Sequence, residues 1–112
     1  MATNDTINVG DPYVAGVRAW RWTTSEPARR VPLDLTTCTL VTTLPNGTQV
    51  TTLIGGLRHP DTGRYELDAT PATEGTYEFD WTMAGSFTDE DGNPRTYTNH
   101  KHKEIHVAPL SD

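Results

Sequence analysis

The chain has 112 residues, enough for one domain that buries about two-thirds of its unfolded surface. Its net charge of −6 argues against general nucleic-acid binding, which needs a basic surface to displace counterions from phosphates. The single cysteine, Cys38, excludes an intrachain disulfide, and the short apolar runs exclude a membrane-spanning helix. The polar residues 1–13 lack the basic and apolar regions of a secretory signal. We therefore expect one domain that folds in a reducing cytosol, with neither a membrane nor a nucleic acid as its partner.

The first half of the chain shows several strand patterns separated by turn residues. Ile7 and Val9 fit a short edge strand, and residues 14–23 fit a second strand that is apolar on both faces. Residues 24–32 are expected to form a loop. Residues 35–44 alternate in the manner of a half-buried strand, with four side chains on one face: Cys38, Leu40, Thr42 and Leu44.

Pro45-Asn46-Gly47 predicts a hairpin turn, because proline presets the first corner and Asn-Gly tolerates a positive φ. Residues 48–54 are then the returning strand, and residues 55–60 a loop. Residues 62–81 read as two strands joined by a tight turn at 70–75, so we expect a second hairpin. Its buried face carries the apolar side chains of both strands: Tyr65, Leu67, Ala69, Tyr77, Phe79, Trp81 and Met83.

The last part of the chain is expected to contain a long acidic loop at 85–95 and a closing strand at 96–107. No segment has a sustained helical period, and strand patterns recur at intervals of about 10–12 residues. The sequence thus predicts an all-β fold, a single immunoglobulin-like β-sandwich of about seven strands. One domain spans residues 1–112, with polar terminal arms at about 1–11 and 108–112 that contact partners.

Asp61-Thr62-Gly63-Arg64-Tyr65 has the D-x-G-x-Y form of a tyrosine corner, in which the phenol bonds to nearby backbone where a late strand begins. Leu67 then stands where an antibody domain carries its second cysteine, so packing alone must hold the core. The alternative is a coincidental turn followed by a core tyrosine.

The chain resembles small immunoglobulin-like virion proteins of tailed bacteriophages, especially those of actinobacterial hosts. The resemblance runs from about Val9 to Val107 and rests on the order and spacing of five phrases: Val9-Gly10-Asp11, Pro32-Leu33-Asp34-Leu35-Thr36-Thr37, Leu44-Pro45-Asn46-Gly47-Thr48, Thr62-Gly63-Arg64-Tyr65 and Gly75-Thr76-Tyr77-Glu78-Phe79-Asp80-Trp81. The longer segment 24–32 and the histidine-rich last strand depart from the pattern.

This resemblance implies a non-enzymatic structural protein of the virion, made in the host cytoplasm and needing no cofactor. A capsid-surface position, as a decoration or minor capsid protein, is our first hypothesis, and a neck or tail position is the second. The partners would be major capsid, neck or tail proteins, or further copies of this chain. A carbohydrate-binding module that recognises a host-surface glycan is the alternative of another class; exposed aromatic side chains in a groove would favour it.

Partner contacts are predicted at the N-terminal arm and at basic and aromatic positions. Trp-Arg alternation is typical of an interface anchor, although a core tryptophan and surface arginines that serve solubility are the simpler interpretation. We expect at least one of the two tryptophans of residues 14–23 to be core. The predicted interface residues are Ile7, Val9, Arg18, Trp20, Arg21, Trp22, Arg29 and Arg30.

The last strand also carries the best metal-ligand candidates. If it is extended, His100, His102, Glu104 and His106 share one face, and histidines two positions apart on a strand can chelate zinc or nickel, with a carboxylate as a third ligand. A solvated face backed by lysines that protect a sheet edge is the interpretation we favour, so no metal is expected. The acidic run 89–93 does not match a helix-flanked calcium loop. No motif predicts a catalytic residue.

Overall fold

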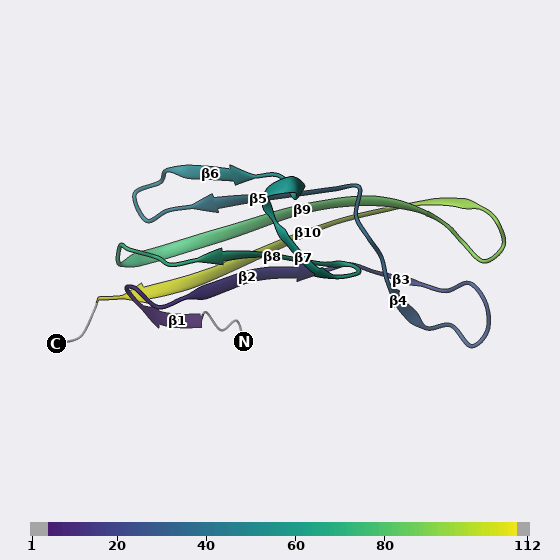
Figure 1. Ribbon diagram of the computed structural model, residues 1–112, viewed down its shortest axis with the longest axis horizontal. Helices are drawn as coiled ribbons and strands as arrows, with labels where there is room; N and C mark the ends of the chain where they lie inside the picture. Colours follow the sequence, from purple (N-terminus) through teal and green to yellow (C-terminus); the bar gives the residue numbers. More distant parts are fainter. Residues whose placement is uncertain (1–4, 110–112) are drawn as a thin grey trace.

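A computed structural model describes residues 5–109, which form strands and turns and one short 3₁₀ segment, η1 (Ile54–Gly56) (Figure 1). The described part is elongated, with principal extents of 59 × 27 × 23 Å. Its strands, in chain order, are β1 (Asp5–Asn8), β2 (Tyr13–Arg18), β3 (Trp20–Trp22), β4 (Arg30–Pro32), β5 (Thr37–Thr43), β6 (Gln49–Thr52), β7 (Arg58–Asp61), β8 (Arg64–Ala69), β9 (Gly75–Thr88) and β10 (Pro94–Ala108).

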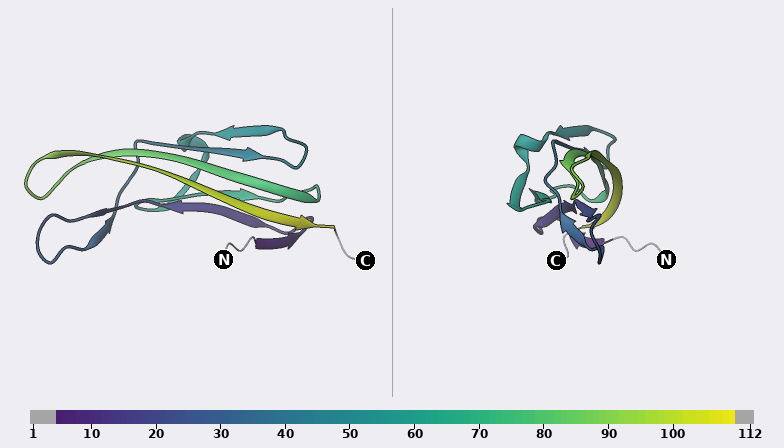
Figure 2. Two further views of the ribbon diagram at one scale, coloured as in Figure 1. Left: turned by 180° about the vertical axis from the view of Figure 1, so that it is seen from behind. Right: turned by 90° about the vertical axis from the view of Figure 1, so that its right-hand side faces the viewer.

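The strands form two main sheets and one small one. The first sheet has the order β1-β10-β9-β5-β6, the second β2-β8-β7, and β3 pairs with β4 alone. All pairs are antiparallel except β1 with β10, which are parallel. The end-on view in Figure 2 shows the strands arranged around a common interior. The predicted all-β sandwich is therefore confirmed.

The core lies between the two main sheets, where the inward side chains of both alternate with outward polar ones. Leu40, Phe79, Trp81 and Ile105 of the first sheet are almost completely buried, as is Tyr65 of the second. Burying large apolar side chains contributes about 1.5–3 kcal/mol each relative to leaving them exposed. The predicted inward face of residues 35–44 is confirmed, because Cys38 and Leu40 are core residues.

The predicted hairpin at residues 62–81 is wrong. β8 pairs with β2 and β7, whereas β9 pairs with β10 and β5, so these consecutive strands belong to opposite sheets. The connection at 70–74 crosses between the sheets, and Pro71 is buried there. Both strands still point alternate side chains into one core. Two strands in opposite sheets therefore show the same alternation as the two strands of a hairpin, and the sequence pattern does not distinguish these arrangements.

The tyrosine corner was predicted at the wrong tyrosine. The Tyr65 hydroxyl accepts a hydrogen bond from the Leu35 amide, 2.8 Å away and thirty residues upstream. Tyr77, at the start of β9, donates to the Thr73 carbonyl 3.0 Å away and four residues upstream. This second geometry is that of a tyrosine corner, where the chain passes from one sheet to the other. Phe79, not Leu67, then lies two residues beyond the corner tyrosine.

Residues 14–23 form two strands rather than one. The Ala19 amide donates to the Gly63 carbonyl at 2.7 Å, and the Leu33 amide donates to the Ala19 carbonyl at 3.0 Å. These bonds hold Ala19 between β2, which pairs with β8, and β3, which pairs with β4. The alternation of buried and outward side chains continues through the break, because Ala15, Val17, Ala19 and Thr23 are buried whereas Trp22 is exposed.

Three predicted loops contain strands. Residues 24–32 end in β4, residues 55–60 include most of β7, and residues 85–95 form the end of a long hairpin. β9 continues to Thr88 and β10 begins at Pro94, which leaves only 89–93 as the turn. Asp89 organises this turn, because its carboxylate accepts from the amides of Asp91 and Asn93 and from the Arg95 side chain.

Two other local predictions are confirmed. Gly47 has φ +89°, and its amide donates to the Leu44 carbonyl, which closes the turn between β5 and β6. Ile7 lies in the predicted short edge strand, β1, whereas Val9 follows that strand in a turn. The predicted terminal arms fall partly on residues 1–4 and 110–112, which lie outside the described residues. Within the described part, the Val9 amide bonds the Ala108 carbonyl at 2.9 Å, so the two segments meet.

Candidate binding surface on the arm

The molecule extends beyond the two main sheets at one end, which we call the arm (Figure 1). The arm consists of the β3–β4 hairpin and residues 85–98 of the β9–β10 hairpin. β9 pairs with β5 only as far as Ala84, so beyond that point its neighbour within the sheet is β10 alone. The β3–β4 hairpin supplies the second layer here, in place of β2 and β8.

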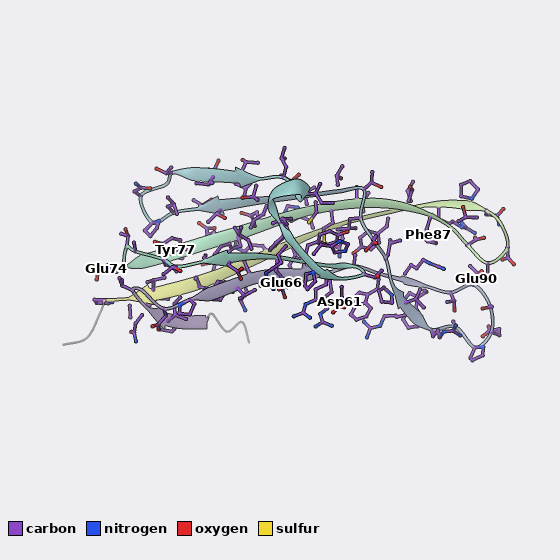
Figure 3. The ribbon with its side chains drawn as sticks, viewed as in Figure 1. Asp61, Glu66, Glu74, Tyr77, Phe87 and Glu90 are labelled. Carbon is purple, nitrogen blue, oxygen red and sulfur yellow. The ribbon has the colours of Figure 1, made fainter. Side chains whose placement is uncertain are left out.

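A partly exposed ion pair joins the two hairpins of the arm. The Arg21 Nη2 atom lies 2.9 Å from Glu90 Oε2, and the guanidinium sits 4.8 Å from the centre of the Phe87 ring. Glu90 Oε1 accepts from the Thr24 amide and hydroxyl at 2.7 and 3.0 Å. Figure 3 shows Phe87 and Glu90 at this end of the molecule, far from Tyr77. The Arg21 hydrogen bond, followed by the Thr24 amide, lowers the pKa of Glu90 to about 2.

An open groove of about 460 Å³ lies between the two hairpins of the arm, and we call it the arm groove. The Trp22 side chain is 62% exposed, and Trp20 is half-buried under the Arg30 guanidinium, 4.5 Å from the ring centre. Such a cation–π contact contributes about 0.5–1 kcal/mol at an exposed site. The groove is lined by Trp20, Arg21, Trp22, Arg30, Phe87, Thr96, Tyr97 and Asn99.

The structure brings four of the predicted interface residues together in this groove: Trp20, Arg21, Trp22 and Arg30. The expectation that one tryptophan of this strand is a core residue is wrong, since neither is among the buried side chains. β3 leaves the main sandwich after Ala19, which carries both rings beyond the core.

The remaining predicted interface residues lie elsewhere. Arg18 and Arg29 are exposed but do not line the groove. Ile7 and Val9 are half-buried and pack against the core of their own domain. Contact of a partner with these four residues stays a prediction.

Sequence reasoning missed the wall of the groove that β9 and β10 supply. Phe87, Thr96, Tyr97 and Asn99 fell within or just after a predicted loop. The available signal was the period of two that continues from Met83 through Phe87 on the inner face of β9.

The arm groove contains two arginines, Arg21 and Arg30. Arg21 is paired with Glu90, whereas the Arg30 guanidinium lies over the Trp20 ring. An exposed tryptophan beside an arginine is a combination that is enriched at protein interfaces.

The last strand also carries a group of potential metal ligands, but its residues differ from the predicted ones. Glu78, His102 and Glu104 each place one ligand atom within 4.8 Å of the others. His102 contacts Asp80, whose hydrogen bond raises the pKa of the imidazole. His106 is exposed on the same strand and does not belong to this group of described residues.

Three other titratable side chains, those of Cys38, Glu66 and His59, are held by packing or ion pairs within the fold. Burial raises the pKa of the Cys38 thiol to about 11, which keeps it protonated and unreactive at neutral pH. Glu66 is buried between Arg58 and Arg64, which lie 2.8 and 2.9 Å from its carboxylate oxygens. The His59 ring stacks on Tyr65, with the two ring centres 4.4 Å apart.

Comparison of the chain with known protein families, curated proteins and solved structures gave no match. Within residues 5–109, no helix has the length and apolar character needed to cross a membrane.

Proposed function

We propose that this protein is an immunoglobulin-like accessory protein of a tailed bacteriophage particle, without enzymatic activity, attached to the capsid surface through the arm groove. The strand order supports an immunoglobulin-like assignment, because β5, β9 and β10 are neighbours in one sheet and β2, β8 and β7 in the other, like strands C, F, G and B, E, D of an immunoglobulin domain. The tyrosine corner at Tyr77, at the sheet-to-sheet connection before β9, supports it as well. The resemblance of the sequence phrases supplies the phage context.

The exposed Trp22 beside Arg30 and Trp20 is the observation that carries this proposal. Tryptophan and arginine are the residues most enriched at binding hot spots, where a large ring fills a pocket and its neighbours exclude water. A ring that is 62% exposed in a formed groove has its apolar surface available to a partner. Arg30, in the lining of the groove, would pair with an acidic group of that partner surface.

The capsid is the proposed location because its repeated surface would let many copies bind, so that a weak contact per copy is sufficient. A small domain offers one interface of ordinary size, in which each partner buries about 800 Å². Many copies on a symmetric shell each bind a repeated surface, and contacts between neighbouring copies add avidity without tight single sites. If the surface that the arm groove binds belongs to a neck or tail protein instead, this protein would be located at the neck or tail.

A carbohydrate-binding function is the second candidate, and the arm groove also favours it. Trp22 and Tyr97 offer aromatic faces, and Asn99 and Thr96 offer hydrogen-bonding groups in the same groove. A pocket with apolar walls and a few polar groups is the usual form of a small-ligand site. In this case the ligand would be a glycan of the host surface.

Sedimentation of the purified protein distinguishes these proposals. The protein is centrifuged alone, then with empty capsids, with isolated tails and with solubilised host cell-wall glycans. The capsid proposal predicts saturable, stoichiometric co-sedimentation with empty capsids. Binding to tails alone would contradict the capsid location. Binding to glycans and to neither virion part would overturn the structural proposal in favour of the second candidate.

A further inference from the structure

The outer face of the β9–β10 hairpin holds a compact group of potential metal ligands outside the arm groove. Glu78 on β9 lies directly opposite Glu104 on β10, and Asp80 lies opposite His102. The ligand atoms of Glu78, His102 and Glu104 all lie within 4.8 Å of one another. The three side chains are between 37% and 45% exposed, so an ion can reach them from solvent.

The imidazole of His102 is oriented for metal binding. Its Nδ1 atom lies 2.6 Å from Asp80 Oδ1, so this nitrogen carries the proton that is donated to the carboxylate. In the neutral imidazole, the other nitrogen, Nε2, then presents its lone pair toward the two glutamates. It lies 3.7 Å from Glu78 Oε1 and 3.8 Å from Glu104 Oε2. A carboxylate behind a ligating histidine is the usual outer partner in zinc sites.

The spacing of these atoms is close to what zinc requires. With bonds of about 2.0–2.1 Å, ligand atoms of a tetrahedral zinc site are about 3.3 Å apart. The two His102 distances exceed this value by about half an ångström or less, and the two glutamate oxygens lie within 4.8 Å of each other. Small rotations of the exposed glutamate side chains can close these gaps. One nitrogen and two carboxylate oxygens suit a borderline cation such as Zn²⁺, with the fourth position open to water.

The electrostatics of this face also favour a cation. Glu78 and Glu104 are like charges directly opposite each other, which destabilises an antiparallel pair. The adjacent strand β5 places uncharged residues beside them, with Thr43 opposite Glu78 and Val41 opposite Asp80. Lys101 and Lys103 alternate to the other face of β10, where Lys101 Nζ bonds the Gly16 carbonyl at 3.3 Å. A divalent ion would offset the repulsion between the glutamates.

We propose that Glu78, His102 and Glu104 bind one Zn²⁺ ion on the outer face of the β9–β10 hairpin, with Asp80 as the positioning residue for His102. The ion would join the two longest strands on the side away from the core. This site is separate from the arm groove and does not depend on the proposed virion function.

Calorimetric titration of the tag-free protein with zinc chloride tests the site. We expect one equivalent of Zn²⁺ to bind, and H102A to lose this binding. D80N should weaken it by roughly ten- to a hundredfold, as removal of outer partners does in other metal sites. H106A is the matched control, because it removes an exposed histidine from the same strand but outside the group.

Thermal unfolding provides a second readout, since an ion that binds only the folded state raises the midpoint. Zinc should raise the midpoint of the wild type and of H106A but not that of H102A. Circular dichroism confirms that each variant is folded, which these surface substitutions should not change. Absence of saturable binding at millimolar zinc, or equal affinity of H102A and wild type, would overturn the proposal.

Discussion

Two tyrosines with similar sequence contexts have different roles in this fold. Tyr65 accepts a hydrogen bond from the Leu35 amide inside the core, whereas Tyr77 donates to the Thr73 carbonyl at the surface corner. Losing the first bond leaves a buried N–H group without a partner. Losing the second leaves a carbonyl at an exposed residue that water can reach.

We therefore expect Y65F to destabilise the fold more than Y77F. The cost of an unpaired buried amide is about 1–3 kcal/mol, against about 0.5–1.5 kcal/mol for an ordinary hydrogen bond that water replaces. Urea denaturation of both variants measures the two changes in unfolding free energy. An equal or reversed order would contradict the different roles assigned to the two phenols.

Gly63 is the second residue whose role is local and specific. Its φ is +75°, and a Cβ atom there would lie 2.7 Å from the Ala19 carbonyl oxygen and 2.9 Å from the Leu33 nitrogen. These are the backbone groups that separate β2 from β3. The Gly63 amide also donates to Asp34 Oδ1 at 2.8 Å.

G63A should lower the unfolding free energy by at least about 3 kcal/mol, since backbone overlap adds to the left-handed penalty of about 1–2 kcal/mol. G47A is the control, because Gly47 has φ +89° but open space around the missing Cβ. G47A should be destabilised only by the left-handed penalty. Similar losses in both variants, measured by thermal unfolding, would show that the close approach at Gly63 is not important.

Among the elements, the β3–β4 hairpin depends on the β9–β10 hairpin for its position. Glu90 joins them through Arg21 and Thr24. The pKa of Glu90 is lowered from 4.5 to about 2, so its stabilisation is fully present above pH 4.5 and is lost as the pH falls toward 2. Protonation should therefore loosen the arm before it affects the core.

E90Q should reproduce this loosening at neutral pH. We expect faster amide exchange in residues 21–30 and unchanged protection of core strands such as β9 before Ala84. E26Q, in the exposed loop of the same hairpin, is the control and should leave exchange as in the wild type. Unchanged exchange in the E90Q arm would mean that packing of Arg21 on Phe87 holds the hairpin without the ion pair.

The individual strands were largely predictable from the sequence, but their pairing was not. The period of two in residues 77–83 identified the buried face of β9, and Asn46-Gly47 identified the β5–β6 turn. Residues 62–81 could not be assigned to two sheets, because strands facing one core from opposite sides have the same alternation as a hairpin. β7 was missed because His59-Pro60 has turn-like composition and lies on the exposed edge of its sheet.

The candidate site was predictable only on one of its walls. The alternation of Trp20, Arg21 and Trp22 drew attention to β3 as an interface. The opposite wall comes from Phe87 and Tyr97, more than sixty positions away in the chain, and only the folded topology brings the two together. The metal-ligand group has the same origin, since Glu78 joins His102 through the β9–β10 register.

At the scale of the whole molecule, the arm and the core are separate. The core lies between the two main sheets, whereas the β3–β4 hairpin, which carries Trp22 and Arg30, lies toward one end of the described residues, whose longest extent is 59 Å (Figure 1). This separation means that substitutions in the arm groove can alter binding without disturbing the core. In the proposed capsid arrangement, each bound copy would project its sandwich end outward or toward a neighbouring copy.

The most direct test of this account is co-sedimentation of the W22A variant with empty capsids, compared with wild type and L53A. Leu53 is 64% exposed outside the arm, so L53A removes a similarly exposed apolar side chain elsewhere on the surface. We predict that W22A lowers capsid affinity about thirtyfold, the effect of losing a hot-spot residue of about 2 kcal/mol, and that L53A binds as wild type does. Equal capsid binding by W22A and wild type would contradict the claim that the arm groove is the attachment surface.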